Sequence, residues 1–173
     1  MKNNQTHSGF SHVPWRGSAF CHSAIRNPQS AIEQLRAGIT TSSADETRSL
    51  AAHVARLLPS DATLALHGDL GVGKTTFVQG LARGLGIDAA ITSPTFTIFT
   101  IHRGTPSLIH LDAYRLENER QIESLMLEDF LVTPYVLAIE WPEKIAAWIS
   151  KTAWHFTLGI TDGQKHFTRL DCP

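Results

Sequence analysis

The sequence predicts an α/β fold of three layers, in which helices cover a mainly parallel sheet that ends in a C-terminal antiparallel hairpin. Short apolar runs of strand length alternate with segments of helical apolar spacing, which is typical of a parallel sheet. From Trp154 onward apolar and polar residues alternate around the turn signal Asp162-Gly163, which predicts a hairpin. A chain of 173 residues with 42% hydrophobic residues is long enough for one domain with a buried core.

A polar leader precedes the predicted domain. Residues 1–43 are rich in Ser, His, Asn and Gln and poor in acids, so we expect a poorly ordered extension, with the stretch Ile32–Ile39 joining the domain as a helix or strand. A transit peptide or a start codon placed too early would give a similar composition. The domain is predicted over residues 44–173, opening with a helix behind the N-cap residue types Ser42 and Ser43.

The first predicted strand leads into a glycine-rich loop. The apolar run Ala62–His67 is followed by GDLGVGKT (Gly68–Thr75) and by a helix with Phe77, Leu81 and Leu85 on one face. This loop fits the pattern G-x-x-x-x-G-K-[ST], whose glycines let backbone N–H groups surround a phosphate at a helix N-terminus. In that pattern the lysine reaches the β and γ phosphates and the hydroxyl binds Mg²⁺. The order of strand, loop and helix therefore predicts a P-loop NTPase-like fold.

Two further strands end in acidic residues. Leu108–Leu111 ends at Asp112 and Tyr135–Ile139 ends at Glu140, with helical spacing between them that predicts a crossover helix and parallel strands. Both carboxylates are then expected at the sheet edge that carries the glycine loop, where they would hold Mg²⁺ or its water. A solvated strand end or a salt-bridge partner is the alternative for each. The residues at helical spacing are Ile122, Leu125, Met126, Phe130 and Leu131.

Two other segments have a structural and a functional interpretation. Ser93–Thr97 lies where P-loop switch proteins place a hydroxyl that senses the γ-phosphate, but it also fits a proline-marked turn before an edge strand. Trp141 follows Glu140 and either packs as a lid over the sheet edge or holds Glu140 in place. The residues alone do not decide between these alternatives.

Charge, cysteine and hydropathy patterns restrict the partners and the compartment. The chain has 15 Lys plus Arg and 16 Asp plus Glu, so its net charge of −1 favours neither nucleic acid nor a membrane surface. Its 2 cysteines lack disulfide or metal spacing, and its 9 histidines show no zinc-ligand spacing. Because no apolar stretch has the length of a membrane helix or the form of a secretory signal, we expect a cytoplasmic protein.

Four motifs in this order resemble the TsaE (YjeE) family of small bacterial P-loop ATPases: GDLGVGKTTFVQGLARGLG, TSPTFT, HLDAYRL and IEWPEK. The resemblance covers roughly residues 44–171. It implies binding of ATP or ADP with Mg²⁺, and a weak ATPase activity that depends on the TsaB–TsaD protein pair. It also implies an indirect association with tRNA, through threonylcarbamoyladenosine modification at position 37.

The resemblance also implies roles for individual residues. Lys74, Asp112 and Glu140 would be catalytic, with Asp112 in a Walker-B-like position, and Thr75 with Glu140 would hold Mg²⁺. Two departures from the family pattern are Ala113, where leucine is usual, and Met126, where glycine often occurs. Ser93, Thr95 and Thr97 would form a switch-like strand. The residues implied to bind the nucleotide phosphates are Leu70, Gly71, Val72, Gly73, Lys74 and Thr75.

Three functions are compatible with these motifs. The first is an ATPase that acts in tRNA threonylcarbamoyladenosine modification. The second is a small-molecule P-loop kinase, and the third is a non-enzymatic binding module in which ATP orders Ser93–Thr97 and changes partner affinity. The ATPase is the leading hypothesis. The kinase is disfavoured, because the sequence contains no Arg-rich lid segment after its middle and leaves no room for a separate substrate domain, whereas the binding module overlaps the ATPase.

Overall fold

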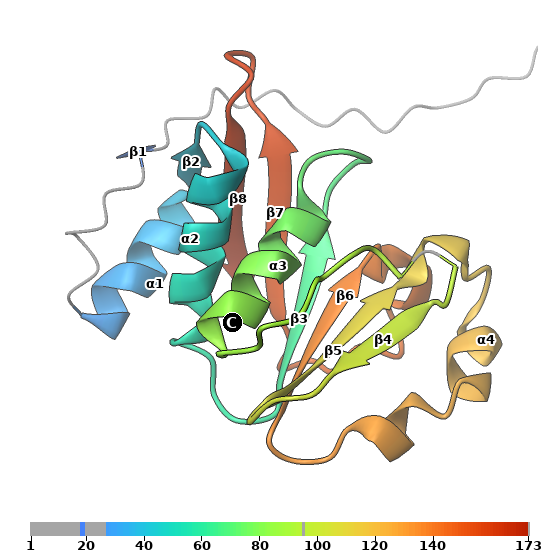
Figure 1. Ribbon diagram of the computed structural model, residues 1–173. Helices are drawn as coiled ribbons and strands as arrows, with labels where there is room; N and C mark the ends of the chain where they lie inside the picture. The colour runs from blue at the N-terminus through green and yellow to red at the C-terminus, as the bar shows by residue number, and fades with distance from the viewer. Residues whose placement is uncertain (1–17, 20–26, 95, 173) are drawn as a thin grey trace, which may run out of the picture.

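The computed structural model describes residues 18–19, 27–94 and 96–172, and within them eight strands form one sheet (Figure 1). The strands lie in the order β1-β2-β8-β7-β3-β6-β5-β4. The strand that precedes the glycine loop, β3, therefore lies in the interior of the sheet. The strands are β1 (Ser18–Ala19), β2 (Ile39–Thr41), β3 (Ala62–His67), β4 (Phe99–His102), β5 (Ser107–Asp112), β6 (Tyr135–Glu140), β7 (Trp154–Ile160) and β8 (His166–Cys172).

The centre of the sheet is parallel, and antiparallel pairs flank it. The neighbours β7, β3, β6 and β5 run parallel, whereas β8 is antiparallel to β7 and to β2, and β4 is antiparallel to β5. The predicted mainly parallel sheet and its C-terminal hairpin are confirmed. Because β3, β5 and β6 are parallel, their carboxyl ends meet at one edge, where ligands bind in open α/β sheets.

Three helices pack on one face of the sheet and bury the larger of two apolar cores (Figure 1). Leu50 and Phe77 contribute from the helices, and Leu64 and Leu66 contribute from β3. None of the helices in the described residues has the length and apolar character needed to span a membrane. The helices are α1 (Pro28–Ala37), α2 (Ala44–Ala55) and α3 (Lys74–Gly84).

The second core lies on the opposite face of the sheet, so the fold has the three predicted layers. Side chains alternate along β5: Leu108 belongs to the first core, and Ile109 and Leu111 belong to the second. Short helical segments cover this second core. They are η1 (Ala113–Arg115), α4 (Glu119–Ser124), η2 (Leu127–Phe130) and η3 (Pro142–Ile145).

The connection between β5 and β6 differs from the predicted crossover helix. The strands are parallel as expected, but α4 ends at Ser124 and a separate 3₁₀ turn, η2, follows. Met126 lies between these two elements in the left-handed conformation, with φ 47° and ψ 42°. This conformation ends an α-helix and favours glycine, which is the residue often found here in the resembled family. The apolar spacing is therefore not the buried face of one helix: Ile122 and Leu127 are buried in the second core, whereas Met126 and Phe130 are exposed.

Part of the predicted leader packs against the domain. The stretch Ile32–Ile39 lies in α1 and at the start of β2. Asn27 caps α1, Leu35 and Ile39 are buried in the first core, and β2 pairs with β8. Both elements lie before the predicted boundary after residue 43. They belong to the folded domain because their apolar side chains are buried against it and β2 pairs with β8. Residues 1–17 and 20–26 lie outside the described residues, and a poorly ordered extension there stays a prediction.

Candidate functional site

The glycine loop connects β3 to the N-terminus of α3 in backbone conformations that need glycine. At Gly68, where φ is 135°, a Cβ atom would lie 2.2 Å from the carbonyl oxygen of Leu158. Gly73 is the N-cap of α3 with φ 101° and has no side chain to cap the helix. The first backbone N–H groups of α3 are therefore left for a ligand, and the helix dipole favours an anion there.

Lys74, the first residue of α3, directly follows this loop and is 5% exposed. Its Nζ donates hydrogen bonds to the carbonyl oxygens of Gly68 (2.7 Å) and Asp69 (2.9 Å), and it lies 3.8 Å from the centroid of the Trp141 ring. Burial lowers the pKa of Lys74, and the nearby carboxylates, Glu140 first, oppose that shift. The loop and the aromatic ring thus hold a cation where the sequence predicts phosphate recognition.

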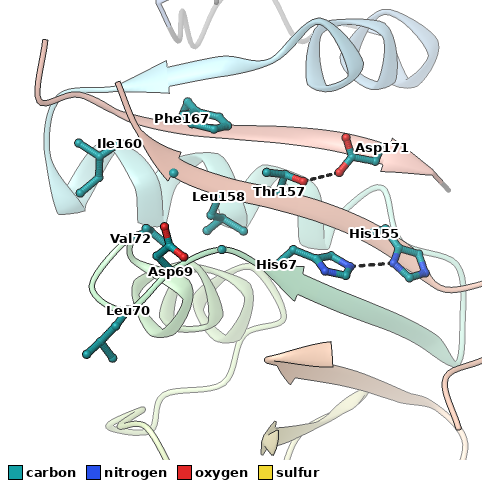
Figure 2. Close-up of a pocket in the computed structure, with 12 residues that line it drawn as sticks. His67, Asp69, Leu70, Val72, His155, Thr157, Leu158, Ile160, Phe167 and Asp171 are labelled. Atoms are coloured by element: carbon teal, nitrogen blue, oxygen red, sulfur yellow. Dashed lines mark hydrogen bonds between the residues drawn. The ribbon is translucent and has the colours of Figure 1, made fainter. Parts of the chain in front are cut away.

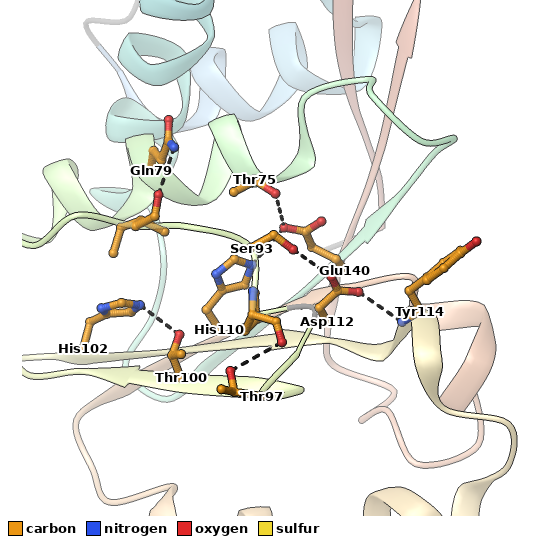
Figure 3. A network of polar contacts seen from close by, with 12 residues as sticks. Thr75, Gln79, Ser93, Thr97, Thr100, His102, His110, Asp112, Tyr114 and Glu140 are labelled. Carbon is orange, nitrogen blue, oxygen red and sulfur yellow. Dashed lines mark hydrogen bonds and ion pairs between the residues drawn. The ribbon is translucent and has the colours of Figure 1, made fainter.

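The two predicted carboxylates lie side by side at the carboxyl ends of β5 and β6. Asp112 and Glu140 are paired in the sheet register, and each is 4% exposed. Thr75 Oγ1 donates to Glu140 Oε1 over 2.8 Å, and Ser93 Oγ donates to Asp112 Oδ2 over 2.8 Å. Figure 3 shows these side chains converging from α3, β5, β6 and the segment before β4. The fold therefore brings together the predicted catalytic and metal-binding residues.

His110 also reaches Glu140, although it is absent from the predicted site. Its Nε2 lies 2.8 Å from Glu140 Oε1, and the side chain is fully buried (Figure 3). In the sequence His110 is one of many scattered histidines without ligand spacing. The available signal was its place in the buried run LIHLD, two residues before Asp112, because alternate residues of a strand face the same side.

The switch-like segment contacts the site through Ser93. Ser93 binds Asp112, whereas Thr97 Oγ1 donates to the carbonyl of Pro94 over 3.4 Å within its own turn. Thr95 lies outside the described residues. The expected edge strand is β4, which begins at Phe99. Ser93 and Thr97 lie in the segment before this strand and do not form the expected switch-like strand, and a γ-phosphate-sensing role for Ser93 stays a prediction.

Trp141 has a strained backbone and packs against the site. Its φ of 59° and ψ of 50° are left-handed, a conformation that costs a non-glycine residue of order 1–3 kcal/mol and is held by its surroundings. Its ring lies over Lys74 and 5.0 Å from the ring of Tyr114. Two roles were predicted for Trp141, a lid over the sheet edge and a support for Glu140. The contact of its ring with Lys74 adds a third role, which is to hold the lysine.

A cavity of about 430 Å³ lies at this site, and Ser93, Tyr114 and Trp141 line part of it. One predicted phosphate-binding residue is turned away from it: Val72 is 6% exposed, and its side chain belongs to the first core. Only the backbone of Val72 is then available to a ligand from this residue. The predicted site residues that line the cavity are Leu70, Gly71, Gly73, Lys74, Thr75, Asp112 and Glu140.

A larger cavity of about 940 Å³ lies on the other side of the glycine loop, beside the β7–β8 hairpin (Figure 2). His67 Nε2 and His155 Nδ1 are 2.9 Å apart there, and their rings stack. Burial and then the charge of His155 lower the pKa of His67. Lys74, Thr75, Asp112 and Glu140 do not line this cavity, so the smaller one is the candidate active site.

The oxygen donors of the smaller cavity fit Mg²⁺ together with a nucleotide phosphate. Thr75 offers a hydroxyl, and Glu140 and Asp112 offer carboxylates, which are the hard ligands that Mg²⁺ prefers. Mg²⁺ in such sites is held by one or two carboxylates plus substrate phosphates, so few protein ligands are needed. Lys74 supplies the positive charge that a phosphate chain requires.

The strand, glycine loop and helix around Lys74, with buried carboxylates at the same sheet edge, define a P-loop protein of the nucleotide-binding class. The model of one family, described as "Threonylcarbamoyl adenosine biosynthesis protein TsaE", matches residues 41–169. The chain belongs to the TsaE family. The resemblance drawn from the four motifs is thereby confirmed.

Individual relatives agree with this assignment. A protein of Treponema pallidum named tRNA threonylcarbamoyladenosine biosynthesis protein TsaE is 36% identical over 127 residues, which cover 73% of this chain and 94% of that protein. The Synechocystis protein of the same name is 48% identical over 99 residues, covering 53% and 61% of the two chains. The crystal structure of Bacillus subtilis YdiB has a TM-score of 0.65 at 28% identity and covers 77% of this chain and 82% of that one.

Proposed function

We propose that this chain is the ATP-binding and ATP-hydrolysing component of the cytoplasmic machinery that makes threonylcarbamoyladenosine at position 37 of tRNA. The observation that carries the proposal is the contact between Thr75 of the glycine loop and the buried carboxylate of Glu140, with Lys74 and Asp112 beside them. Family membership and the names of the relatives support the pathway. The geometry supports a Mg²⁺-dependent ATPase in that pathway.

Each site residue then has a chemical role. Lys74 stabilises the negative charge that develops on the β and γ phosphates, and backbone N–H groups of Leu70–Thr75 surround the phosphate chain. Thr75 and Glu140 hold Mg²⁺, which when bound neutralises phosphate charge and polarises the bond that breaks. Asp112 orients a metal-bound or attacking water, and its bond to Ser93 links that water to the switch-like segment.

The proposed partner is the TsaB–TsaD protein pair, and tRNA is reached through that pair. The near-neutral charge of the chain gives no reason to propose direct tRNA contact. Partner binding would complete the site and raise a weak basal activity.

The experiment that tests the proposal is Mg²⁺-dependent release of phosphate from ATP by the purified chain, alone and with TsaB–TsaD. Weak release that rises with the pair and disappears in Lys74→Ala is the expected result, because this change removes the charge that stabilises the phosphates. The loss in Lys74→Ala should be at least about 100-fold in turnover. Phosphate release at the same rate with and without TsaB–TsaD, or no release in either case, would contradict the ATPase role.

The second candidate function is the nucleotide-gated binding module. The hydrogen bond from Ser93 to Asp112 favours it, because this bond connects the switch-like segment to the acidic side of the site. A non-hydrolysable ATP analogue separates that function from the ATPase. If the analogue supports TsaB–TsaD binding and full tRNA modification, hydrolysis is not required. Transfer of the γ-phosphate to an added acceptor, in place of release to water, would favour the kinase.

A further inference from the structure

A fully buried histidine lies against the carboxylate that the proposed function assigns to Mg²⁺. His110 is on β5, on the face that also carries Leu108 and Asp112, and it is diagonal to Glu140 on β6. Leu108 packs in the apolar core, whereas His110 directs Nε2 at Glu140 Oε1 over 2.8 Å (Figure 3). Burying an imidazole is costly unless it is hydrogen-bonded, so this contact accounts for a polar residue at a core position.

The second ring nitrogen assigns the direction of that hydrogen bond. His110 Nδ1 is buried without a hydrogen-bond partner in the described part of the chain. A carboxylate oxygen accepts hydrogen bonds, so Nε2 carries the proton and donates it to Glu140. Nδ1 then carries a lone pair, so the His110 ring has no unpaired N–H.

Two donors from different elements meet at one carboxylate oxygen. Thr75 Oγ1 reaches Glu140 Oε1 from α3, and His110 Nε2 reaches the same oxygen from β5, each over 2.8 Å. Both donors use Oε1, so they leave Oε2 to a ligand. Replacing a residue that hydrogen-bonds to a metal ligand commonly lowers metal affinity or activity by about 10–100-fold.

We propose that His110 is a positioning residue, which donates from Nε2 to Glu140 and orients its carboxylate toward the metal of the metal–nucleotide complex. The inference rests on the proposed function, in which Glu140 holds Mg²⁺. It adds a residue that does not itself touch metal or nucleotide.

The test compares metal affinity with nucleotide affinity in the full chain. Mn²⁺ binding in the presence of ADP is followed by electron paramagnetic resonance, and ADP binding in EDTA is followed by calorimetry. We expect His110→Leu to weaken Mn²⁺ binding about 10-fold or more while metal-free ADP affinity changes less than about twofold. His110→Gln, whose amide N–H reaches the same place, should retain most of the Mn²⁺ affinity. His102→Leu is the matched control, because His102 is a neighbouring histidine on β4 whose Nε2 pairs with Thr100.

Wild-type Mn²⁺ affinity in His110→Leu, or an equal loss in His102→Leu, would overturn the proposal. If His110→Leu does not fold, His110→Asn replaces it, since its shorter amide cannot reach Glu140, and equal affinities in the Asn and Gln variants overturn the proposal. If the wild-type chain binds no ADP with or without Mn²⁺, the proposed function fails. Imidazole ¹⁵N spectra then decide the His110 contact, because a resonance of protonated Nε2 that shifts in Glu140→Gln supports it and an unchanged resonance contradicts it.

Discussion

Glu140 is the residue at which three elements of the site meet. It ends β6, it accepts a hydrogen bond from Thr75 at the start of α3, and it accepts another from His110 on β5. It is 4% exposed, so few water molecules compete for its carboxylate. A change at Glu140 should therefore act on the arrangement of the metal and the reacting phosphate more than on the grip of the loop on the nucleotide.

We expect Glu140→Ala to lower ATP turnover on the order of 100-fold, while ATP affinity changes only a few-fold, because the loop and Lys74 still bind the phosphates. Steady-state hydrolysis with TsaB–TsaD and calorimetric ATP binding measure the two effects. Glu123→Ala, an exposed acid on α4, is the control and should resemble the wild type. A Glu140→Ala protein that hydrolyses ATP at the parental rate in the full complex would refute its role.

His67 predicts a pH dependence of stability at the residue scale. Its pKa is lowered from 6.5 by burial and then by His155, so the unfolded state binds the proton more readily than the folded state. Its stabilising contribution is present above pH 6.5 and is lost as the pH falls through the lowered pKa. We expect wild-type unfolding midpoints in urea to drop more steeply between pH 7 and pH 5 than those of His67→Gln. The difference should be small, because the side chain is 35% exposed, and parallel curves would contradict it.

At the scale of elements, the close packing of α2 on α3 sets the position of the glycine loop. A Cβ atom at Gly80 would lie 2.4 Å from the carbonyl oxygen of Arg48 and 2.6 Å from the Cβ of Ala51, and Gly84 is similarly close to α2. The α2 backbone and its alanine methyl groups approach α3 this closely because the two glycines have no side chain. Because α3 begins at Lys74, a shift of this helix would move the proposed phosphate site.

Gly80→Ala is expected to lower the free energy of unfolding by about 1–3 kcal/mol, since the added methyl group overpacks the interface. Intrinsic helix propensity alone predicts the opposite sign, a gain of up to about 1 kcal/mol. Urea unfolding measures the sign directly. Arg83→Ala, at an exposed position of the same helix, is the control and should change stability by less than about 0.5 kcal/mol. If Gly80→Ala stabilised the protein, α2 and α3 would have to move apart at little cost, which would contradict the prediction.

At the scale of the whole molecule, the first core joins the N-terminal elements to the strand of the glycine loop. Leu35 of α1 is 1% exposed in the same cluster as Leu64 and Phe77. The core is continuous across α1, α3 and β3. We therefore expect α1 and β2 to unfold together with the rest of the described chain.

Leu35→Ala should lower the free energy of unfolding of the whole molecule by about 2–5 kcal/mol, because it leaves a cavity in the shared core. Circular dichroism and tryptophan fluorescence should report the same urea midpoint, which tests cooperativity. Arg36→Ala, the exposed neighbour on α1, should leave the midpoint nearly unchanged. An early transition in one signal, or a wild-type midpoint in Leu35→Ala, would show that α1 folds separately.

Local sequence predicted the parts of the fold and site that depend on neighbours in the chain. The glycine loop, its flanking strand and helix, the strands ending at Asp112 and Glu140, and the C-terminal hairpin all follow from spacing within a few residues. The predicted crossover helix was wrong in part, because the backbone at Met126 is left-handed and interrupts it. The apolar spacing continues across this interruption, so the sequence pattern did not reveal it. The wider family assignment came from four motifs considered together, and the comparisons confirm it.

Which of these residues touch depends on the three-dimensional fold. Thr75 and Glu140 are 65 positions apart, and His110 and Glu140 are 30 apart, so no local pattern specifies their hydrogen bonds. The same is true of the Trp141 ring over Lys74 and of Val72 turning into the core. The residue types of the loop and the strand-end carboxylates can be recognised from sequence alone, because local backbone geometry selects them. Their arrangement into one site depends on strand order and register, which are set by packing across the whole sheet.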